Sequence, residues 1–253
     1  MPSPTPTRLS FTENRLALRL FLGQAAMLGA WSSIGTPANA LISGYALTVL
    51  GMRREDTGLL GACVYLAAIW QFLSFLVTNR LADRRRFVLL AGAGEVLCMA
   101  LGLAVPWLFG RGGGLASVVF LGLLFLSGTC LHIAQPLLGS WLSAVVPARI
   151  RGRYLGSRQF LMTGLATVGT WVGLRVVNHW PTWGGFAAVI AACCLAGLAG
   201  VAILSRAPMP QVSQQSHFRL RDFVGVFRLR DFRRYLVFVI MLAPAALVVY
   251  LMP

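Results

Sequence analysis

Glu95 is the residue whose chemistry is most conspicuous in this sequence, because it is the single acidic residue inside a long apolar stretch. In a helix with a rise of about 1.5 Å per residue, it would lie about 12 Å along that stretch. An ionisable side chain in an apolar medium is costly, which makes it a functional hypothesis by default. Its carboxyl group could carry a proton, or stay charged beside an arginine of a neighbouring loop. A structural hydrogen bond is the other interpretation, so Glu95 is a candidate for proton or ion coupling.

Further polar side chains lie inside apolar stretches, where each needs a hydrogen-bonding partner. His132 and Gln135 are three residues apart, which places them on one face of a helix. As a set, these residues could line a path for a small solute: Gln24, Trp31, Asn39, Gln71, His132 and Gln135. For each one singly, a hydrogen bond that packs two helices is at least as good an interpretation.

Long apolar helices must position these side chains. The chain has 253 residues, of which 57% are hydrophobic and only 11% are charged, whereas a soluble domain has about 25% charged residues. A membrane helix needs about 20 mostly apolar residues. Runs of this kind occur at 18–44, 58–79, 87–109, 115–142, 159–178, 184–205 and 233–252. The sequence therefore predicts an all-α membrane protein.

The basic residues predict how the helices are oriented. The net charge of +15 would suggest nucleic acid if it lay on one folded face, but the arginines occur in short clusters between apolar runs, so we expect no nucleic-acid partner. All 22 are arginine, and all except Arg53, Arg54, Arg111 and Arg175 would lie on one side of the membrane. The positive-inside rule makes that side cytoplasmic. We expect a multi-pass protein of the inner membrane with a cytoplasmic N-terminus, close to anionic headgroups.

The chain is expected to have four parts: a disordered cytoplasmic tail (1–17), a six-helix transmembrane bundle (18–205), a cytoplasmic linker (206–232) and a seventh helix (233–253). The linker contains a repeat, because Phe218–Phe223 reads Phe-Arg-Leu-Arg-Asp-Phe and recurs at 227–232. Arginines alternating with aromatics favour a helix in the membrane interface, with a solvated connector as the alternative. A cleaved signal peptide ending near Ala38-Asn39-Ala40 is the competing interpretation of the first apolar run.

The sequence contains no recognisable catalytic or metal-binding motif. The five cysteines all lie in apolar runs without metal-ligand spacing: Cys63, Cys98, Cys130, Cys193 and Cys194. Neither a Gly-x-Ser-x-Gly nor a His-Glu-x-x-His motif occurs. We therefore expect no catalytic residue, no metal and no cofactor, and an intramembrane enzyme is the weakest alternative.

Two loops carry a resemblance to a known family. The stretch Asn79–Arg86 reads Asn-Arg-Leu-Ala-Asp-Arg-Arg-Arg and resembles the signature loop of the major facilitator superfamily, Gly-x-Leu-Ala-Asp-Arg-x-Gly-Arg-Arg. The stretch 147–156 is similar to the Pro-x-x-x-Arg-Gly-x-x-x-Gly run that these transporters carry between their fourth and fifth helices. Asp231–Tyr235 is similar to the residues that begin their second half. By this resemblance the cytoplasmic gate comprises Asp83, Arg84, Arg86, Arg151, Gly152 and Arg153. An ordinary charged turn is the alternative for the first loop.

The resemblance implies a fold and an activity. Facilitator transporters have two six-helix halves, each with nested inverted repeats, and move a small solute by alternating access. This chain would be the six-helix N-terminal bundle with a seventh, truncated transmembrane helix, and its partner would be the missing C-terminal half or a second copy. A non-transporting membrane subunit or assembly factor of the same fold is the alternative function.

Overall fold

The computed structural model describes residues 11–35, 39–53, 56–71, 74, 83–110 and 112–209, together with the single positions 230, 233, 234 and 237. These residues form helices and connecting turns, without any strand among them, which confirms the prediction of an all-α protein. The chain divides into two compact units, Met1–Ser213 and Gln214–Pro253. The predicted interfacial repeat and seventh helix lie almost entirely outside the described residues.

The first unit contains helices over each of the first six expected spans. They are α1 (Phe11–Gly35), α2 (Ala40–Thr48), α3 (Thr57–Ala67), α5 (Arg84–Gly102), α6 (Val105–Phe109), α7 (Gly114–Val145), the 3-10 helix η2 (Ala148–Ile150), α8 (Arg151–His179) and α9 (Trp183–Leu204). Among the described residues, three stretches are long and apolar enough to cross a membrane: Gly114–Val145, Ala148–His179 and Trp183–Leu204. These helices fit a membrane-embedded protein.

The first apolar run differs from the expected single helix in two ways. Helix α1 begins at Phe11, so residues 11–17 of the expected disordered tail are helical. The Arg15 guanidinium lies 4.4 Å from the centre of the Phe11 ring, a cation–π contact between neighbours on one helix face. The run also forms two helices, because Asn39 caps a new helix: its side-chain oxygen accepts a hydrogen bond from the backbone N–H of Leu41 at 2.8 Å.

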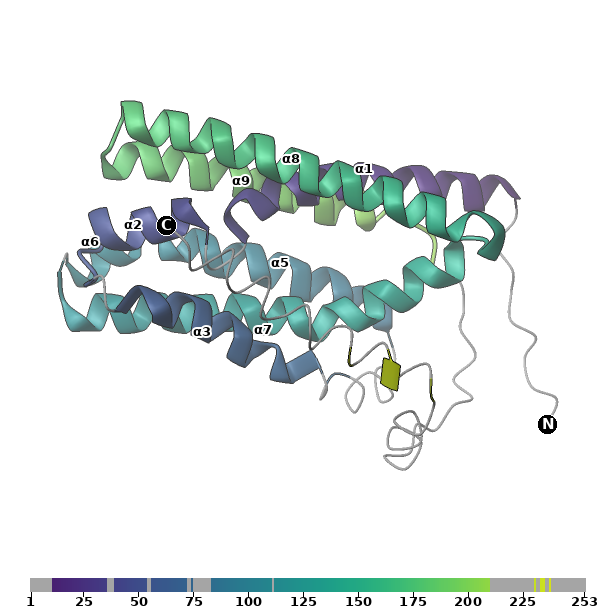
Figure 1. Cartoon of the computed structure of the whole chain (residues 1–253), viewed down its shortest axis with the longest axis horizontal. Coiled ribbons are helices and arrows are strands. Elements are labelled where there is room, and N and C mark those ends of the chain that lie inside the picture. Colours follow the sequence, from purple (N-terminus) through teal and green to yellow (C-terminus); the bar gives the residue numbers. More distant parts are fainter. Residues whose placement is uncertain are drawn as a thin grey trace. The chain divides into compact units, whose positions relative to one another are not determined.

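The helix contacts repeat within this unit (Figure 1). Counting along the chain, the segments are α1–α2, α3, α5–α6, α7, α8 and α9. Helix α1 packs against α8 and α9, and α7 packs against α3 and α5. If each segment is replaced by the one three places further along the chain, counting cyclically, α1 becomes α7, α8 becomes α3 and α9 becomes α5. The contacts of α1 then become the contacts of α7, and the contact of α5 with α9 is unchanged. The most extensive contacts of the unit are therefore related by a shift of three segments, whereas the contact of α8 with α9 has no equally extensive counterpart between α3 and α5. We call the first three segments the first repeat and the last three the second repeat.

Aromatic side chains and glycines hold the two repeats together. Tyr45 of α2 lies between Phe120 of α7 and Phe186 of α9, with ring centres 5.5 and 5.9 Å away, and its hydroxyl donates to the carbonyl of Gly102. A Cβ atom on Gly197 of α9 would lie 2.8 Å from the Val96 side chain. Glycine thus permits a close approach of membrane helices, as small residues do in general.

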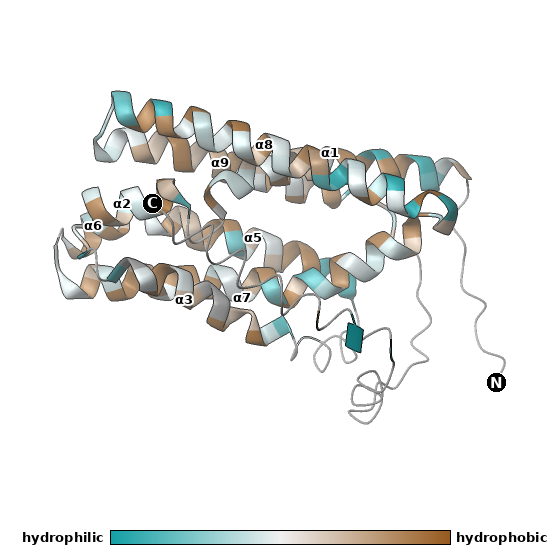
Figure 2. Cartoon of the chain, in the orientation of Figure 1, coloured by the Kyte–Doolittle hydropathy of each residue, from teal (hydrophilic) through white to brown (hydrophobic). Residues whose placement is uncertain are grey.

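Hydrophilic residues gather toward the ends of the helices, with apolar residues along their length (Figure 2). At the end where α8 begins, a second core packs Phe21 edge-on against Trp141, with ring centres 5.5 Å apart. The indole N–H of Trp141 donates to the carbonyl of Pro208, which ties the chain after α9 to α7. This end also holds the arginines that flank α5 and α8.

Candidate functional site

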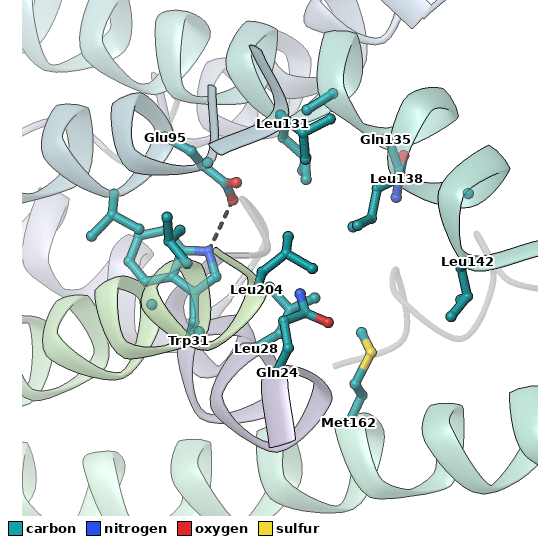
Figure 3. Close-up of a pocket in the computed structure, with 18 of the residues that line it drawn as sticks. Gln24, Leu28, Trp31, Glu95, Leu131, Gln135, Leu138, Leu142, Met162 and Leu204 are labelled. Atoms are coloured by element: carbon teal, nitrogen blue, oxygen red, sulfur yellow. Dashed lines mark hydrogen bonds between the residues drawn. The ribbon is translucent and has the colours of Figure 1, made fainter. Parts of the chain in front are cut away.

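A cavity of about 250 Å³ lies at the boundary between the two repeats (Figure 3). Its lining comes from α1 and α5 of the first repeat and from α7, α8 and α9 of the second. The polar side chains among the lining residues are Gln24, Trp31, Glu95, Gln135, Arg158 and Gln159. Leucine, valine and methionine side chains make up most of the remaining wall. The structure therefore brings Gln24, Trp31, Glu95 and Gln135, four residues singled out from the sequence, to one cavity.

Glu95 and Trp31 form a buried pair in the wall of the cavity. The indole Nε1–H of Trp31 donates to Oε1 of Glu95 at 2.9 Å, and the two residues are only 2% and 8% exposed. The hydroxyl of Ser127 donates to the backbone carbonyl of Glu95 at 3.1 Å. Glu95 therefore forms a structural hydrogen bond, which was one of the two interpretations of this residue. It also lines the cavity, as its other interpretation, proton or ion coupling, requires.

Arg158 is a cavity residue that the sequence did not single out. Its Nη2 donates to Oε1 of Gln24 at 3.0 Å, and its Nε is buried without a hydrogen-bond partner among the described residues. One turn earlier, the Tyr154 hydroxyl donates to the carbonyl of Leu18 at 2.7 Å and joins α8 to α1. The expected fifth span begins at 159 and leaves Arg158 in the basic loop before it, but α8 already begins at Arg151. In the sequence, only the position of Arg158 directly before an apolar run indicated that it could belong to a membrane helix.

Asn39 lies in a different place from these residues. Its side-chain amide donates to the carbonyl of Ser33 at the end of α1. The same nitrogen lies 3.5 Å from Oγ1 of Thr170 on α8, to which it also donates. Asn39 lines a second, more open cavity of about 630 Å³, together with Thr163 and Thr167 of α8. Gln159 and Met162 line both cavities, which therefore adjoin each other along α8. Asn39 therefore connects the broken first segment to α8 and does not share the cavity of Gln24 and Glu95.

His132 and Gln71 also lie apart from the cavity. His132 is half-buried on α7, and its Nδ1 is buried without a partner in the described part of the chain. It is not a lining residue, although Gln135, three residues further along α7, is one. Gln71 is exposed beyond the end of α3. The expected shared face of His132 and Gln135 thus places only Gln135 at the cavity.

The predicted gate residues take local roles at the ends of helices. Asp83 caps α5 by accepting from the backbone N–H of Arg86 at 3.0 Å, and its carboxylate also pairs with Nε of Arg86 at 3.0 Å. The neighbouring Arg85, which the resemblance did not assign, donates to the carbonyl of Ser205 just after α9. An arginine there complements the negative end of the helix dipole. The first loop thus joins α5 to α9.

The second basic loop caps α7 in the same manner. Nη2 of Arg151 donates to the carbonyls of Ser143 and Val146 at 3.0 and 3.4 Å, which are among the last carbonyls of α7. Gly152 and Arg153 are exposed on the first turn of α8. Arg84 is half-buried at the start of α5. A gating role for these residues stays a prediction from the resemblance.

No protein-family model matches the chain, and no curated protein matches it by sequence. The resemblance to facilitator transporters therefore depends on the sequence motifs alone.

Proposed function

We propose that the chain forms the N-terminal six-helix bundle of a major facilitator type transporter, which moves a small solute across the inner membrane by alternating access. The observation that carries this proposal is the repeated packing, in which α1 contacts α8 and α9 as α7 contacts α3 and α5. Consecutive membrane spans run in opposite directions, so a shift of three spans relates helices of opposite direction. Such inverted repeats are a common construction of secondary transporters, whose binding sites lie where the repeats meet.

The cavity has the position and the chemistry that this proposal requires. It lies between the repeats, and Gln24, Glu95 and Gln135 are among the polar groups in its mostly apolar walls. Polar side chains at membrane depth are costly and mark solute or ion pathways. We propose that Gln24 and Gln135 contact the solute and that Glu95 couples its movement to a proton or ion. The C-terminal half, or a second copy, would complete the path.

The two ends of α8 support a transmembrane orientation with a cytoplasmic N-terminus. Helix α8 has 29 residues and is therefore about 43 Å long, more than the hydrocarbon core of about 30 Å. Arg151 and Arg153 lie at its first end, whereas Trp180 follows its other end and is exposed. Near that other end, Trp107 and Trp183 pack edge to face with ring centres 5.3 Å apart. Arginines inside and tryptophans at the interface are typical of membrane proteins.

Uptake by proteoliposomes tests the proposal. The full chain, with any subunit that copurifies with it, is reconstituted and offered a panel of labelled solutes under a pH gradient. Gly139 lines the cavity and a Cβ there would meet open space, so Gly139→Phe is expected to fill the cavity without disturbing the helices. Gly164→Phe is the matched control, because Gly164 on α8 is equally free of neighbours and is not a lining residue.

We expect saturable uptake of at least one solute by the unaltered chain and by Gly164→Phe, and loss of that uptake in Gly139→Phe. Equal uptake in the two variants would contradict a solute path through this cavity. An absence of saturable uptake across the panel would favour the non-transporting alternative.

A further inference from the structure

We propose that Arg158 and Gln24 form a binding site for the carboxylate of a small organic anion with an apolar body. As a statement about the transported substrate, this inference rests on the proposed function. As a statement about binding, it depends only on the cavity and its side chains.

Arg158 carries a charge that has no counter-ion among the described residues. The guanidinium has five N–H donors in a planar fork, and the structure gives it one acceptor, Oε1 of Gln24 at 3.0 Å. Its Nε is buried and has no partner in the described chain. No described carboxylate pairs with it, since the described ion pairs that involve Asp83 and Asp56 are made with Arg86 and Arg53. Arg158 is half-buried, and a charge that is partly removed from water without an ionic partner is costly, so an anion would relieve that cost.

The other described polar groups near Arg158 already have partners or form no ion pair with it. Glu95, the one acid of the cavity wall, accepts from the indole of Trp31 at 2.9 Å and forms no ion pair with Arg158. The Tyr154 hydroxyl, one turn away on α8, is engaged with the carbonyl of Leu18. Gln24 is only 5% exposed and presents its carbonyl oxygen to Arg158, which holds the guanidinium at the cavity. The free donors of Arg158 are therefore available to a ligand.

The shape and lining of the cavity define the ligand further. A planar guanidinium matches the two oxygens of a carboxylate and binds them with paired hydrogen bonds. The remaining wall includes the apolar side chains of Leu28, Leu138, Met162 and Leu204 (Figure 3). The cavity of about 250 Å³ is smaller than the roughly 300–1,000 Å³ of sites for drug-sized ligands. A compact aromatic or branched monocarboxylate fits this description, and benzoate is a suitable probe.

An anion at this site has two possible sources, because the basic end of the bundle also lies near lipid headgroups in the proposed orientation. A headgroup phosphate would offer the same oxygens to Arg158 as a dissolved carboxylate. The apolar walls and the buried amide of Gln24 favour a solute that enters the cavity as a whole. Binding in bilayers with and without anionic lipid separates the two sources.

The experiment is a titration with benzoate of the full chain in phosphatidylcholine nanodiscs. Isothermal calorimetry measures the binding. We expect saturable binding of benzoate and none of benzamide, its neutral analogue. Hydrogen bonds to charged groups are worth about 1.5–3 kcal/mol, so Arg158→Gln should weaken binding by about ten- to a hundredfold. Arg158→Lys, which keeps the charge, should retain part of the affinity. Arg175→Gln, at an exposed arginine of the same helix, is the control and should bind as the unaltered chain does.

Three results would overturn the proposal: no benzoate binding below about 10 mM, equal affinity for benzamide, or the same affinity in Arg158→Gln as in Arg175→Gln. Folding of each variant is checked by circular dichroism and by the midpoint of thermal unfolding, and Arg158→Lys reports on the site if Arg158→Gln fails to fold. If phosphatidylglycerol in the nanodiscs abolishes benzoate binding to the unaltered chain, the site is for a headgroup and the solute assignment is wrong. Benzoate binding without transport of any carboxylate would leave the site standing and contradict only the proposed function.

Discussion

Trp31 of α1 and Glu95 of α5 are joined by a hydrogen bond of 2.9 Å that connects the first and third helical segments inside the wall of the cavity. Both side chains are almost fully buried, and α9 approaches the Trp31 ring so closely that a Cβ atom on Gly197 would lie 3.2 Å from it. The one acid expected within a membrane span is therefore both a packing element and a cavity residue. Its two roles can be separated by substitution.

Glu95→Gln retains an oxygen that can accept from Trp31, so we expect the midpoint of thermal unfolding to stay close to that of the unaltered chain. Glu95→Leu and Trp31→Phe each leave a buried polar group without a partner, which costs about 1–3 kcal/mol. Both should unfold at a lower temperature. Equal stability of Glu95→Gln and Glu95→Leu would contradict the importance of this hydrogen bond.

The same Glu95→Gln variant tests coupling, because the amide cannot carry a proton. If Glu95 couples solute movement to protons, uptake driven by a pH gradient should be lost while solute exchange at equal pH persists. Uptake of a labelled solute by proteoliposomes, with and without the gradient, measures both quantities. A variant that still responds fully to the gradient would assign Glu95 a structural role alone.

Gly197 allows α9 to approach α1 and α5. A Cβ atom there would lie 2.8 Å from Val96 Cγ2 and 3.2 Å from the Trp31 ring. Gly197→Leu should therefore overpack this contact and cost about 1–3 kcal/mol of stability. Gly164→Leu places the same side chain where a Cβ meets open space and serves as the control. Thermal unfolding in detergent should show a lower midpoint for Gly197→Leu, and equal midpoints for the two variants would contradict the packing.

Arg85 should matter more to the basic end of the bundle than Arg86 does. Arg85 reaches the carbonyl of Ser205 after α9, whereas Arg86 forms an exposed pair with Asp83, its neighbour in sequence. Exposed ion pairs contribute about 0–1 kcal/mol at most. Hydrogen exchange of the backbone amides at 202–207 should accelerate in Arg85→Gln and stay nearly unchanged in Arg86→Gln. The reverse order would show that the contact between α5 and α9 is not what protects this end.

The two ends of α8 should lie on opposite sides of the membrane. In a variant without native cysteines, Gly152→Cys and His179→Cys each place one exposed thiol at an end of this helix. A maleimide that cannot cross membranes should label His179→Cys in intact cells, and Gly152→Cys only after permeabilisation. Labelling of both positions from the same side would contradict the proposed topology.

Run lengths and arginine clusters were sufficient to predict the helical class and helices over the first six spans. Hydropathy could not show where α1 breaks, because that depends on the capping geometry of Asn39. It also set the start of the fifth span at 159, since arginines lower the mean hydropathy even where the backbone is helical. For this reason Arg158 was counted with a loop, although it lies inside α8.

The composition of the cavity could be predicted only in part. Gln24, Trp31, Glu95 and Gln135 were recognisable because polar groups within apolar runs are rare. Their meeting at one cavity, and the separation of Asn39 and His132 from it, depend on which faces of the helices pack together. Periodicity within one helix does not contain that information. Arg85 was missed for a similar reason, because its partner, the carbonyl of Ser205, is distant in sequence.

Alternating access to the cavity is the central claim, and the accessibility of a single cysteine tests it most directly. Gln135→Cys, in a variant without native cysteines, is exposed to a thiol reagent that cannot cross membranes, added to right-side-out or to inside-out vesicles. The account predicts labelling from both sides, with a transported solute protecting the cysteine in both preparations. Labelling from one side only, unchanged by any solute, would contradict it and indicate a membrane subunit that does not transport.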